Sequence, residues 1–487
     1  MAGAAGARAD QASVAVTSGR TTASLPSGFT GLGLEYNTVP EWVGRGTVDP
    51  VLVRLIRNLT PTGRPVIRIG GQSTDRVWWP VRGMHQPLGV TYGLSPRWTA
   101  AGRALAGATG GRLLLGINLE ANRTRISQTE ADQLVRGVGS RSIDALEIGN
   151  EPDLYPLVPW YKLVNGRPAP WYDPAGSSVF SRPLSWGPAQ YVQELTRVLR
   201  VLPPGPIAGP ETNIAPWLAA VSGLRSRRTP LRVLTSHAYG LNQCILDPTS
   251  PQYPTVPNLL SRSASENLLA GVAPDVGAAH RRGETFRIDE MGSVTCNGRP
   301  GVSNTMASAL WVLDALFAVA RQGVDGVNLH TYPNSDNGLF DLSHARGGWT
   351  ARIHPLYYGA LMFAQAAPAG SALLRVVSAG AGTIRSWATI GPDRRVRVLV
   401  INDSLTNATR ADIRAPAGYG RLAGSLERLR APSAYASAGV TLGGRSFGAT
   451  TASGILAAPV AQTVTPRGGV YAVRLPPASA GLLTLAR

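Results

Sequence analysis

The sequence predicts an α/β protein, a (β/α)8 TIM barrel followed by a C-terminal all-β sandwich domain. Through the first three quarters of the 487 residues, short β-type runs alternate with helical stretches, which is typical of parallel strands joined by crossover helices. After about residue 370 the helical stretches stop, and short alternating runs are separated by Gly, Pro, Asn and Ser. We therefore expect an N-terminal segment over 1–28, a barrel over 29–368 and a sandwich over 369–487.

Eight runs have the length and composition of buried parallel strands, and helical intervals separate most of them. Eight such strands fit one closed barrel, which typically takes about 250 residues and more with insertions. The expected strands are Thr30–Tyr36, Pro65–Gly70, Arg112–Asn118, Ala145–Gly149, Ile207–Pro210, Arg232–Ala238, Thr285–Glu290 and Gly326–His330.

The clearest helix is expected over Ser303–Gln322, where Ser303 and Asn304 are candidates for the N-cap and Gly323 follows the last turn. Its apolar run is interrupted by Asp314 and is too short to span a bilayer. We therefore interpret it as an amphipathic helix and expect no membrane association.

Two further segments have a predicted place in this architecture. The run Ala12–Thr17 is a candidate extra strand of the sandwich. Residues 152–187, rich in Pro, Trp and Tyr, predict an extended loop after the fourth barrel strand. Loops of this length in compact domains are usually functional.

The net charge of +18 comes almost entirely from arginine, because Lys162 is the only lysine. Together with the abundance of Ala, Gly and Pro, this favours the codon bias of a GC-rich genome over attraction of an anionic substrate, although both interpretations stay open. The arginines are scattered and no cluster is interleaved with aromatics, so we expect no nucleic-acid partner. The N-terminus lacks a signal peptide, which fits either a trimmed secreted or periplasmic protein, our expectation, or a cytoplasmic one.

The two cysteines, Cys244 and Cys296, each follow a predicted strand of the barrel. If those strands are neighbours, the loops after them lie side by side and a disulfide between the two cysteines is reachable. Two free thiols are the alternative.

Two glutamates end the fourth and seventh predicted strands, where a barrel of this type carries its reactive groups. Glu151 stands in the run Glu147–Asp153, and Glu290 in the run Ile288–Ser293. Hydrolysis of an acetal needs one carboxylic acid to protonate the leaving oxygen and a carboxylate on the other side of the anomeric carbon. At a separation of about 5–5.5 Å the carboxylate attacks directly, with retention of configuration. The pair therefore predicts a retaining glycoside hydrolase.

The residues around the pair refine this prediction. Asn150 is placed to hydrogen-bond the sugar 2-hydroxyl, whereas Glu147 lies inside the strand and is expected to point into the barrel interior or form a salt bridge. The six histidines show no ligand spacing such as His-x-x-x-His, so we expect neither a metal nor another cofactor.

Three segments resemble glycoside hydrolase family 79, a family of β-glucuronidases and heparanase-like enzymes. They are Arg68–Asp75 (Arg-Ile-Gly-Gly-Gln-Ser-Thr-Asp), Glu147–Asp153 with its Asn-Glu-Pro, and Ile288–Ser293 followed by Pro300–Thr305. The resemblance covers the barrel and extends to the sandwich. It implies that Glu151 is the general acid/base and Glu290 the nucleophile. The chain departs from the family after the eighth strand, where His330-Thr331-Tyr332-Pro333 replaces a glycine-rich turn.

Other polar residues at strand ends are candidates for sugar binding, and each could instead be a structural residue of the rim. By resemblance, a tyrosine after the sixth strand hydrogen-bonds the nucleophile. Asp75 has a further alternative as an ion-pair partner of Arg68 and Arg76. A loop with glycine and Arg299 follows the nucleophile and is the candidate for holding a uronic acid carboxylate. The binding candidates are Glu35, Ser73, Asp75, Asn150, His237, Tyr239, Asn297, Gly298, Arg299 and Tyr332.

The sequence thus predicts a retaining β-glucuronidase whose partner is a carbohydrate, a glucuronic-acid-bearing glycan or glycoside. One alternative is a retaining glycosidase for a neutral sugar, such as a xylosidase or arabinofuranosidase. The other is a non-catalytic glycan-binding protein on an inactive barrel.

Overall fold

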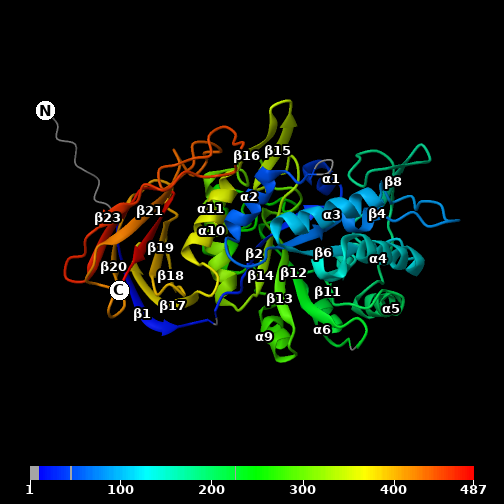
Figure 1. Ribbon diagram of the computed structural model, residues 1–487, viewed down its shortest axis with the longest axis horizontal. Helices are drawn as coiled ribbons and strands as arrows, with labels where there is room; N and C mark the ends of the chain where they lie inside the picture. The colour runs from blue at the N-terminus through cyan, green and yellow to red at the C-terminus, as the bar shows by residue number, and fades with distance from the viewer. Residues whose placement is uncertain (1–9, 23, 44–46, 225) are drawn as a thin grey trace.

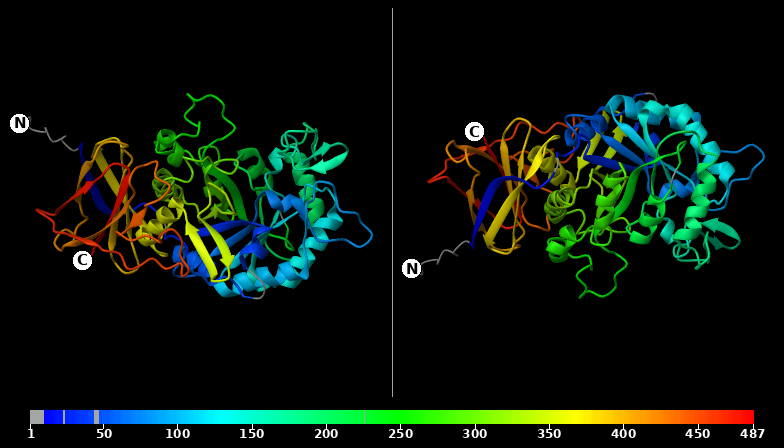
Figure 2. Two further views of the ribbon diagram at one scale, coloured as in Figure 1. Left: turned by 90° about the horizontal axis from the view of Figure 1, so that it is seen from above. Right: turned by 90° about the horizontal axis from the view of Figure 1, so that it is seen from below.

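The computed structural model describes residues 10–487 except 23, 44–46 and 225. A closed barrel wrapped by helices lies beside a separate β-domain (Figure 1). Seen from above and below, the helices ring the barrel, and the β-domain packs against one side of it (Figure 2). The predicted fold class is confirmed.

All eight predicted barrel strands are present, and every neighbouring pair is parallel. Their order around the barrel follows the sequence, so consecutive strands are neighbours. The sixth and seventh strands run further than predicted, to Leu241 and Val294. The strands are β2 (Thr30–Glu35), β3 (Val66–Gly70), β6 (Arg112–Ile117), β7 (Ile143–Ile148), β11 (Ile207–Gly209), β12 (Leu231–Leu241), β13 (Thr285–Val294) and β14 (Gly326–His330).

The helices cover the outside of the barrel, as crossover connections between parallel strands require (Figure 2). Several begin with a proline in the first turn, where the missing N–H costs no hydrogen bond. They are α1 (Thr38–Val43), α2 (Pro50–Leu59), α3 (Pro96–Thr109), α4 (Thr124–Val138), α5 (Pro188–Leu199), α6 (Ala215–Ser222), α7 (Val256–Leu259), α8 (Arg262–Glu266), α9 (Ala273–Arg281), α10 (Met306–Arg321) and α11 (Pro355–Ala366).

Helix α10 corrects two expectations. It begins at Met306, because the Ser303 hydroxyl accepts a hydrogen bond from the Arg299 amide at 3.0 Å and belongs to the preceding turn. It is also not amphipathic, since every residue from Met306 to Ala320 is buried. Figure 1 shows the reason: α10 and α11 lie between the barrel and the β-domain, so both sides of α10 are covered. No helix in the described part of the chain is long and apolar enough to cross a bilayer.

Trp387 fixes the β-domain against α10. Its ring stacks on Phe317 with centroids 5.5 Å apart, and its indole N–H donates to Asp314 Oδ1 at 2.7 Å. We expect Trp387→Ala to lower the free energy of unfolding by about 3–5 kcal/mol, because it removes a buried aromatic and the hydrogen-bond donor to one oxygen of the buried Asp314 carboxylate. Urea denaturation measures this loss. The exposed Tyr435→Ala is the control, and equal midpoints for the two variants would contradict the assignment.

The β-domain is a ten-stranded sheet that folds over on itself and encloses its own apolar core, a sandwich in architecture. Residues 12–17 lie in its first strand, β1 (Asp10–Arg20), which pairs antiparallel with β17 and parallel with β20. The other strands are β17 (Ala372–Gly380), β18 (Ile384–Ile390), β19 (Val396–Asn402), β20 (Thr409–Arg414), β21 (Gly424–Arg430), β22 (Thr441–Leu442), β23 (Gln462–Val464), β24 (Val470–Leu475) and β25 (Ser479–Leu485).

Three small sheets interrupt the barrel, each after the carboxyl end of a strand. The first follows β3, the second β7 and the third β14. The segment predicted as an extended loop over 152–187 thus carries a three-stranded sheet of its own. These strands are β4 (Val77–Trp78) and β5 (Tyr92–Gly93); β8 (Tyr161–Val164), β9 (Arg167–Ala169) and β10 (Ser177–Val179); and β15 (Phe340–Ala345) and β16 (Gly348–Ile353).

Candidate active site

Glu151 and Glu290 lie at the carboxyl-terminal end of the barrel, where Glu151 follows β7 and Glu290 is part of β13. The chain leaves β7 through a tight turn in which Gly149 has φ +84° and Glu151 has φ +46°. A Cβ at position 149 would lie 2.5 Å from the Tyr155 hydroxyl, so only glycine fits there. This turn positions Glu151 over the barrel mouth.

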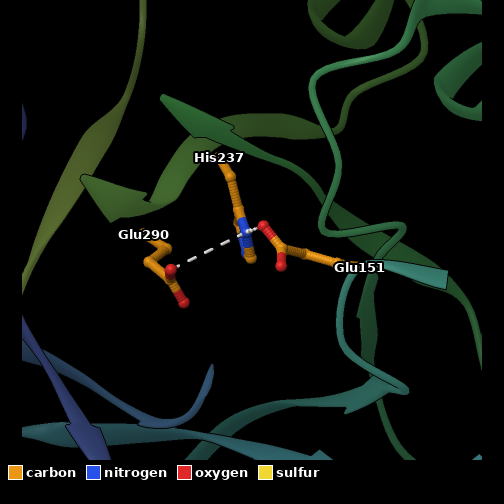
Figure 3. Close-up of side chains that lie close together, drawn as sticks. All are labelled: Glu151, His237 and Glu290. Carbon is orange, nitrogen blue, oxygen red and sulfur yellow. Dashed lines mark hydrogen bonds and ion pairs between the residues drawn. The ribbon is translucent and has the colours of Figure 1, made fainter. Parts of the chain in front are cut away.

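The two carboxylates are neighbours. Oxygens of Glu151 and Glu290 and a ring nitrogen of His237 all lie within 4.8 Å of one another. Figure 3 shows the His237 ring between the two carboxylates, and its Nδ1 is 2.9 Å from Glu151 Oε1. The Glu151 side chain is one-third exposed, whereas that of Glu290 is buried. One carboxylate therefore reaches solvent and the other is enclosed by protein.

Glu290 is held by hydrogen bonds on both oxygens. The Tyr239 hydroxyl donates to Oε1 at 2.6 Å, and Arg68 Nη1 donates to Oε2 at 2.7 Å. His330 Nδ1 lies 3.4 Å from Oε1. Burial by itself would raise the pKa of Glu290, but the charges of His330, His237 and Arg68 outweigh it and hold this pKa well below the usual range. Glu290 is therefore an ionised carboxylate at neutral pH.

The two histidines have the opposite shift. Burial alone would lower their pKa values, but the Glu290 carboxylate raises the pKa of His237 and, together with Glu35, raises that of His330 to about 10. His330 is therefore a cation at neutral pH. It was not among the predicted site residues, although it ends the eighth predicted strand and the strand-end rule applies to it.

Arg68 is the second residue that the sequence did not assign to the site. Its buried guanidinium donates to Glu147 at 2.9 Å, Glu211 at 2.5 Å and Asn150 Oδ1 at 2.9 Å, besides Glu290. It thus links β3 to β7, β13 and the residues after β11. Glu147 has the interior salt bridge expected for it. No local pattern separates Arg68 from other strand arginines, because its partners come from distant parts of the chain; the one signal is its place at the start of the segment Arg68–Asp75 that resembles family 79.

Two groups of residues have the donor types of a metal site: Glu151, His237 and Glu290, and below them Glu211, His237 and Asp289. Arg68 contacts Glu290 and Glu211 directly and lies 3.7 Å from Asp289, so a fixed cation already occupies this acidic pocket. Burial, reinforced by the charge of Glu147, also raises the pKa values of Glu211 and Asp289 well above the usual range. Groups that favour protonation are poor metal ligands, and we assign no metal here.

Glu35 contacts His330, which in turn lies beside Glu290. Its Oε1 is 3.0 Å from His330 Nε2, and its Oε2 accepts from the Ser73 amide at 2.8 Å. The Ser73 hydroxyl donates to Gly70 O and accepts from the Tyr36 amide, so Ser73 supports the rim rather than facing a ligand. Tyr239 and His330 therefore contact the nucleophile, Glu35 contacts His330, and Ser73, predicted to bind sugar, positions Glu35 instead.

Asp75 is likewise a structural residue. Its Oδ1 accepts from the amides of Leu119 and Glu120, and its Oδ2 accepts from the Asn150 amide and the Tyr155 hydroxyl. With four donors and full burial, it has no capacity left for a sugar. The predictions that it binds substrate or pairs with Arg68 are wrong. It instead fixes the backbone of Asn150 beside Glu151.

The loop after β13 contains consecutive left-handed residues, Cys296, Asn297 and Gly298, with φ values of +55°, +77° and +87°. Tyr332 donates to Asn297 Oδ1 at 2.7 Å, so the two predicted residues meet. Arg299 does not join them: its guanidinium lies over the Tyr253 ring, 5.0 Å from the centroid. The guanidinium of Arg299 thus contacts Tyr253 rather than Asn297 or Tyr332, and its binding of the sugar stays a prediction.

Cys244 and Cys296 lie side by side on the loops after β12 and β13, as neighbouring strands require. Their Sγ atoms are 3.7 Å apart and both thiols are free. Since a disulfide has a length of about 2.05 Å, the predicted bond is not formed in this structure.

Comparison with curated proteins finds two β-glucuronidases of low identity. The chain is 24% identical to the β-glucuronidase of Aspergillus niger, over 94% of this chain and 90% of that protein. It is 25% identical to that of Neurospora crassa, over 63% of this chain and 57% of that protein. The chain thus spans less than two thirds of the Neurospora protein and most of the Aspergillus one. No protein-family model matches the chain.

Comparison with solved structures gives the same fold over nearly the whole chain. A 4-O-α-L-rhamnosyl-β-D-glucuronidase from Fusarium oxysporum 12S matches with a TM-score of 0.69 and 20% identity, over 97% of this chain and all of that one. A family 51 arabinofuranosidase from Xanthomonas axonopodis pv. citri matches with a TM-score of 0.67 and 14% identity, over 98% of this chain and all of that one. The expected resemblance to β-glucuronidases is confirmed: this chain is similar in sequence to two curated β-glucuronidases and shares its fold with solved glycosidase structures.

Proposed function

We propose that the chain is a retaining β-glucuronidase that acts by double displacement, with Glu290 as nucleophile and Glu151 as general acid/base. The observation that carries the proposal is the approach of the two carboxylates to within 4.8 Å. Retaining enzymes separate their carboxyl groups by about 5–5.5 Å, whereas inverting enzymes need about 6.5–9.5 Å to admit a water. This spacing supports direct attack by one carboxylate.

In the first step, ionised Glu290 attacks the anomeric carbon while Glu151 gives its proton to the leaving glycosidic oxygen. The bond to the leaving group breaks, and an ester between the sugar and Glu290 forms. Tyr239 and Arg68 hold the attacking carboxylate in one orientation, so little reorganisation is needed during attack. Asn150, fixed by Arg68 and Asp75, is placed to bind the sugar 2-hydroxyl.

In the second step, Glu151 removes a proton from water, which attacks the anomeric carbon and releases Glu290. The partial exposure of Glu151 supports this role, since the water must reach the side of the sugar that the leaving group vacated. Two inversions give net retention. Contact between His237 and Glu151 keeps the acid/base side chain over the site in both steps.

The uronic acid carboxylate needs donors or positive charge near the sugar. The left-handed loop after β13 can present backbone N–H groups, and the side-chain amide of Asn297, whose oxygen accepts from the Tyr332 hydroxyl, adds a further donor beside them. Cationic His330 adds charge on the same side of Glu290. The similarity to curated β-glucuronidases points to the same glycone. We further propose that the protein works outside the cytoplasm, on glucuronic-acid-bearing glycans or glycosides.

Hydrolysis of nitrophenyl glycosides tests the proposed function. We expect turnover of the β-glucuronide at least 100-fold faster than that of the β-glucoside, β-xyloside or α-arabinofuranoside. Proton NMR of the first product should show the β-anomer. Faster turnover of a neutral glycoside would replace the assignment with a neutral-sugar glycosidase. Binding without turnover of any of them would indicate a non-catalytic glycan-binding protein.

Glu151→Ala should distinguish the acid/base from the nucleophile. We expect kcat on the nitrophenyl glucuronide to fall by about 10²–10⁴-fold, with a smaller loss on a dinitrophenyl glucuronide whose leaving group needs no proton. Added azide, which needs no general base, should restore turnover and yield the β-glucuronosyl azide. An equal loss on both substrates without azide rescue would show that Glu151 has another role.

A further inference from the structure

A groove of about 440 Å³ lies on the β-domain, outside the catalytic site. One face of β21 forms its floor, where Leu426, Arg428 and Arg430 alternate with residues that point the other way. Thr441 and Gln462 border the groove. They lie on β22 and β23, which pair with two different parts of the same edge of β21. Its volume falls in the range of pockets that hold small ligands, about 300–1,000 Å³.

The groove contains two uncompensated positive charges. Arg428 donates to Arg474 O at 2.7 Å and to Gln462 Oε1 at 3.2 Å, which fixes its guanidinium without neutralising it. Arg430 is exposed, and no carboxylate of the described residues lies within ion-pair distance of either arginine. Partial burial, together with the charge of Arg430, lowers the pKa of Arg428. The neighbouring Glu427 turns to the opposite face, where burial raises the pKa of its carboxyl.

The rim of the groove continues to the catalytic end of the barrel. Pro432 and Gly439 line the groove, and the loop between them accepts hydrogen bonds from the first amides of α10: Met306 to Ala436 O at 2.8 Å and Ala307 to Ala434 O at 2.9 Å. Helix α10 begins directly after the loop that follows β13 and Glu290. In Figure 1 the loops of this part of the β-domain reach the same side of the molecule as the β15–β16 hairpin, which follows barrel strand β14.

We propose that this groove is an accessory binding site for a carboxylate-bearing saccharide, in which Arg428 and Arg430 bind the carboxylates of uronic acid units. A guanidinium group can bind a carboxylate through two parallel hydrogen bonds. Arg428 and Arg430 have no carboxylate partner among the described residues of the protein, so both are available to a carboxylate of the ligand. Exposed Val460 supplies apolar surface for the face of a sugar ring. The site would keep a polymeric substrate on the enzyme between cleavages. The choice of a uronic acid ligand rests on the proposed function.

Binding of a hyaluronan hexasaccharide, measured by isothermal titration calorimetry, tests the proposal. All variants would carry Glu290→Gln, which prevents turnover. The groove variant is Arg428→Gln/Arg430→Gln, and the control is Arg375→Gln/Arg414→Gln. The control arginines lie on β17 and β20, which flank β1 at the other end of the sheet, and their loss removes the same charge. We expect the groove variant to lose one binding site or at least 10-fold in affinity, and the control to stay within about 2-fold. Arg430→Gln alone, which breaks no contact in the structure, should lose part of the affinity.

Two outcomes would overturn the inference. One is equal binding of the hexasaccharide by the groove and control variants. The other is arginine-dependent binding of neutral chitohexaose with the same affinity, which would remove the role of the carboxylates. In an otherwise wild-type protein, Arg428→Gln/Arg430→Gln should leave turnover of the nitrophenyl glucuronide unchanged, because that substrate reaches only the barrel. Failure of the wild-type protein to cleave this glucuronide would refute the proposed function. The binding experiment would still show whether the groove binds a carboxylate-bearing saccharide.

Discussion

Glu290→Gln is expected to lower kcat for a nitrophenyl glucuronide by about 10⁴–10⁶-fold. The substitution preserves the size of the side chain, removes the charge that attacks the anomeric carbon, and replaces one of the two accepting oxygens with an amide donor. Since Tyr239 and Arg68 hold this carboxylate on both oxygens, no neighbouring group can take its place without moving. Steady-state kinetics measures the loss, and binding of glucuronate should persist.

The matched control is Glu41→Gln, which removes an exposed carboxylate at the surface of α1. Its kcat should equal that of the wild type. A Glu290→Gln variant that retained more than about one hundredth of the wild-type rate after repurification would contradict the assignment of the nucleophile.

Arg68→Met is expected to damage both stability and catalysis. The substitution leaves Glu147, Glu211 and Glu290 without their shared cation in a buried site. Removing one partner of a buried ion pair typically costs about 3–5 kcal/mol, so the unfolding midpoint in urea should fall clearly. Arg68→Lys keeps the charge but not the fork of donors, and an intermediate loss is expected.

The pH profile separates the catalytic effect of Arg68 from the structural one. Burial raises the pKa of Glu290, and the charges of His330, His237 and Arg68 lower it. Glu290 must be ionised to attack, so activity is lost as the pH falls through this pKa. Removing the Arg68 charge raises the pKa, and the acid limb of kcat/KM should move to higher pH in Arg68→Met but little in Arg68→Lys. A loss of stability with an unmoved acid limb would mean that Arg68 does not tune the nucleophile.

Local patterns were sufficient to predict the architecture. The eight strands appear as apolar runs because both faces of a barrel strand are buried, and their ends locate the two glutamates. Helix α10 was harder: whether a helix is covered on one side or two depends on the β-domain, whose packing no periodicity within Met306–Arg321 reveals. The segment 152–187 was read as a loop because its strands are only three or four residues long.

At the site, the sequence distinguishes poorly between residues that face a ligand and residues that support them. Asp75 and Glu35 both lie at strand ends, yet Asp75 accepts four hydrogen bonds from the protein while Glu35 contacts His330, the neighbour of the nucleophile. This distinction depends on which donors converge on each carboxylate in three dimensions. For the same reason Arg68, the residue that unites the site, has no local signal, whereas His330 had one in its position at the end of β14.

Covalent labelling with a slow substrate identifies the nucleophile. The protein would be incubated with 2-deoxy-2-fluoro-β-D-glucuronosyl fluoride, digested, and sequenced by tandem mass spectrometry. The proposed mechanism predicts a single fluoroglucuronosyl ester on Glu290, formed with loss of activity. An ester on any other carboxylate, or an unlabelled enzyme that releases the α-anomer from a β-glucuronide, would contradict it.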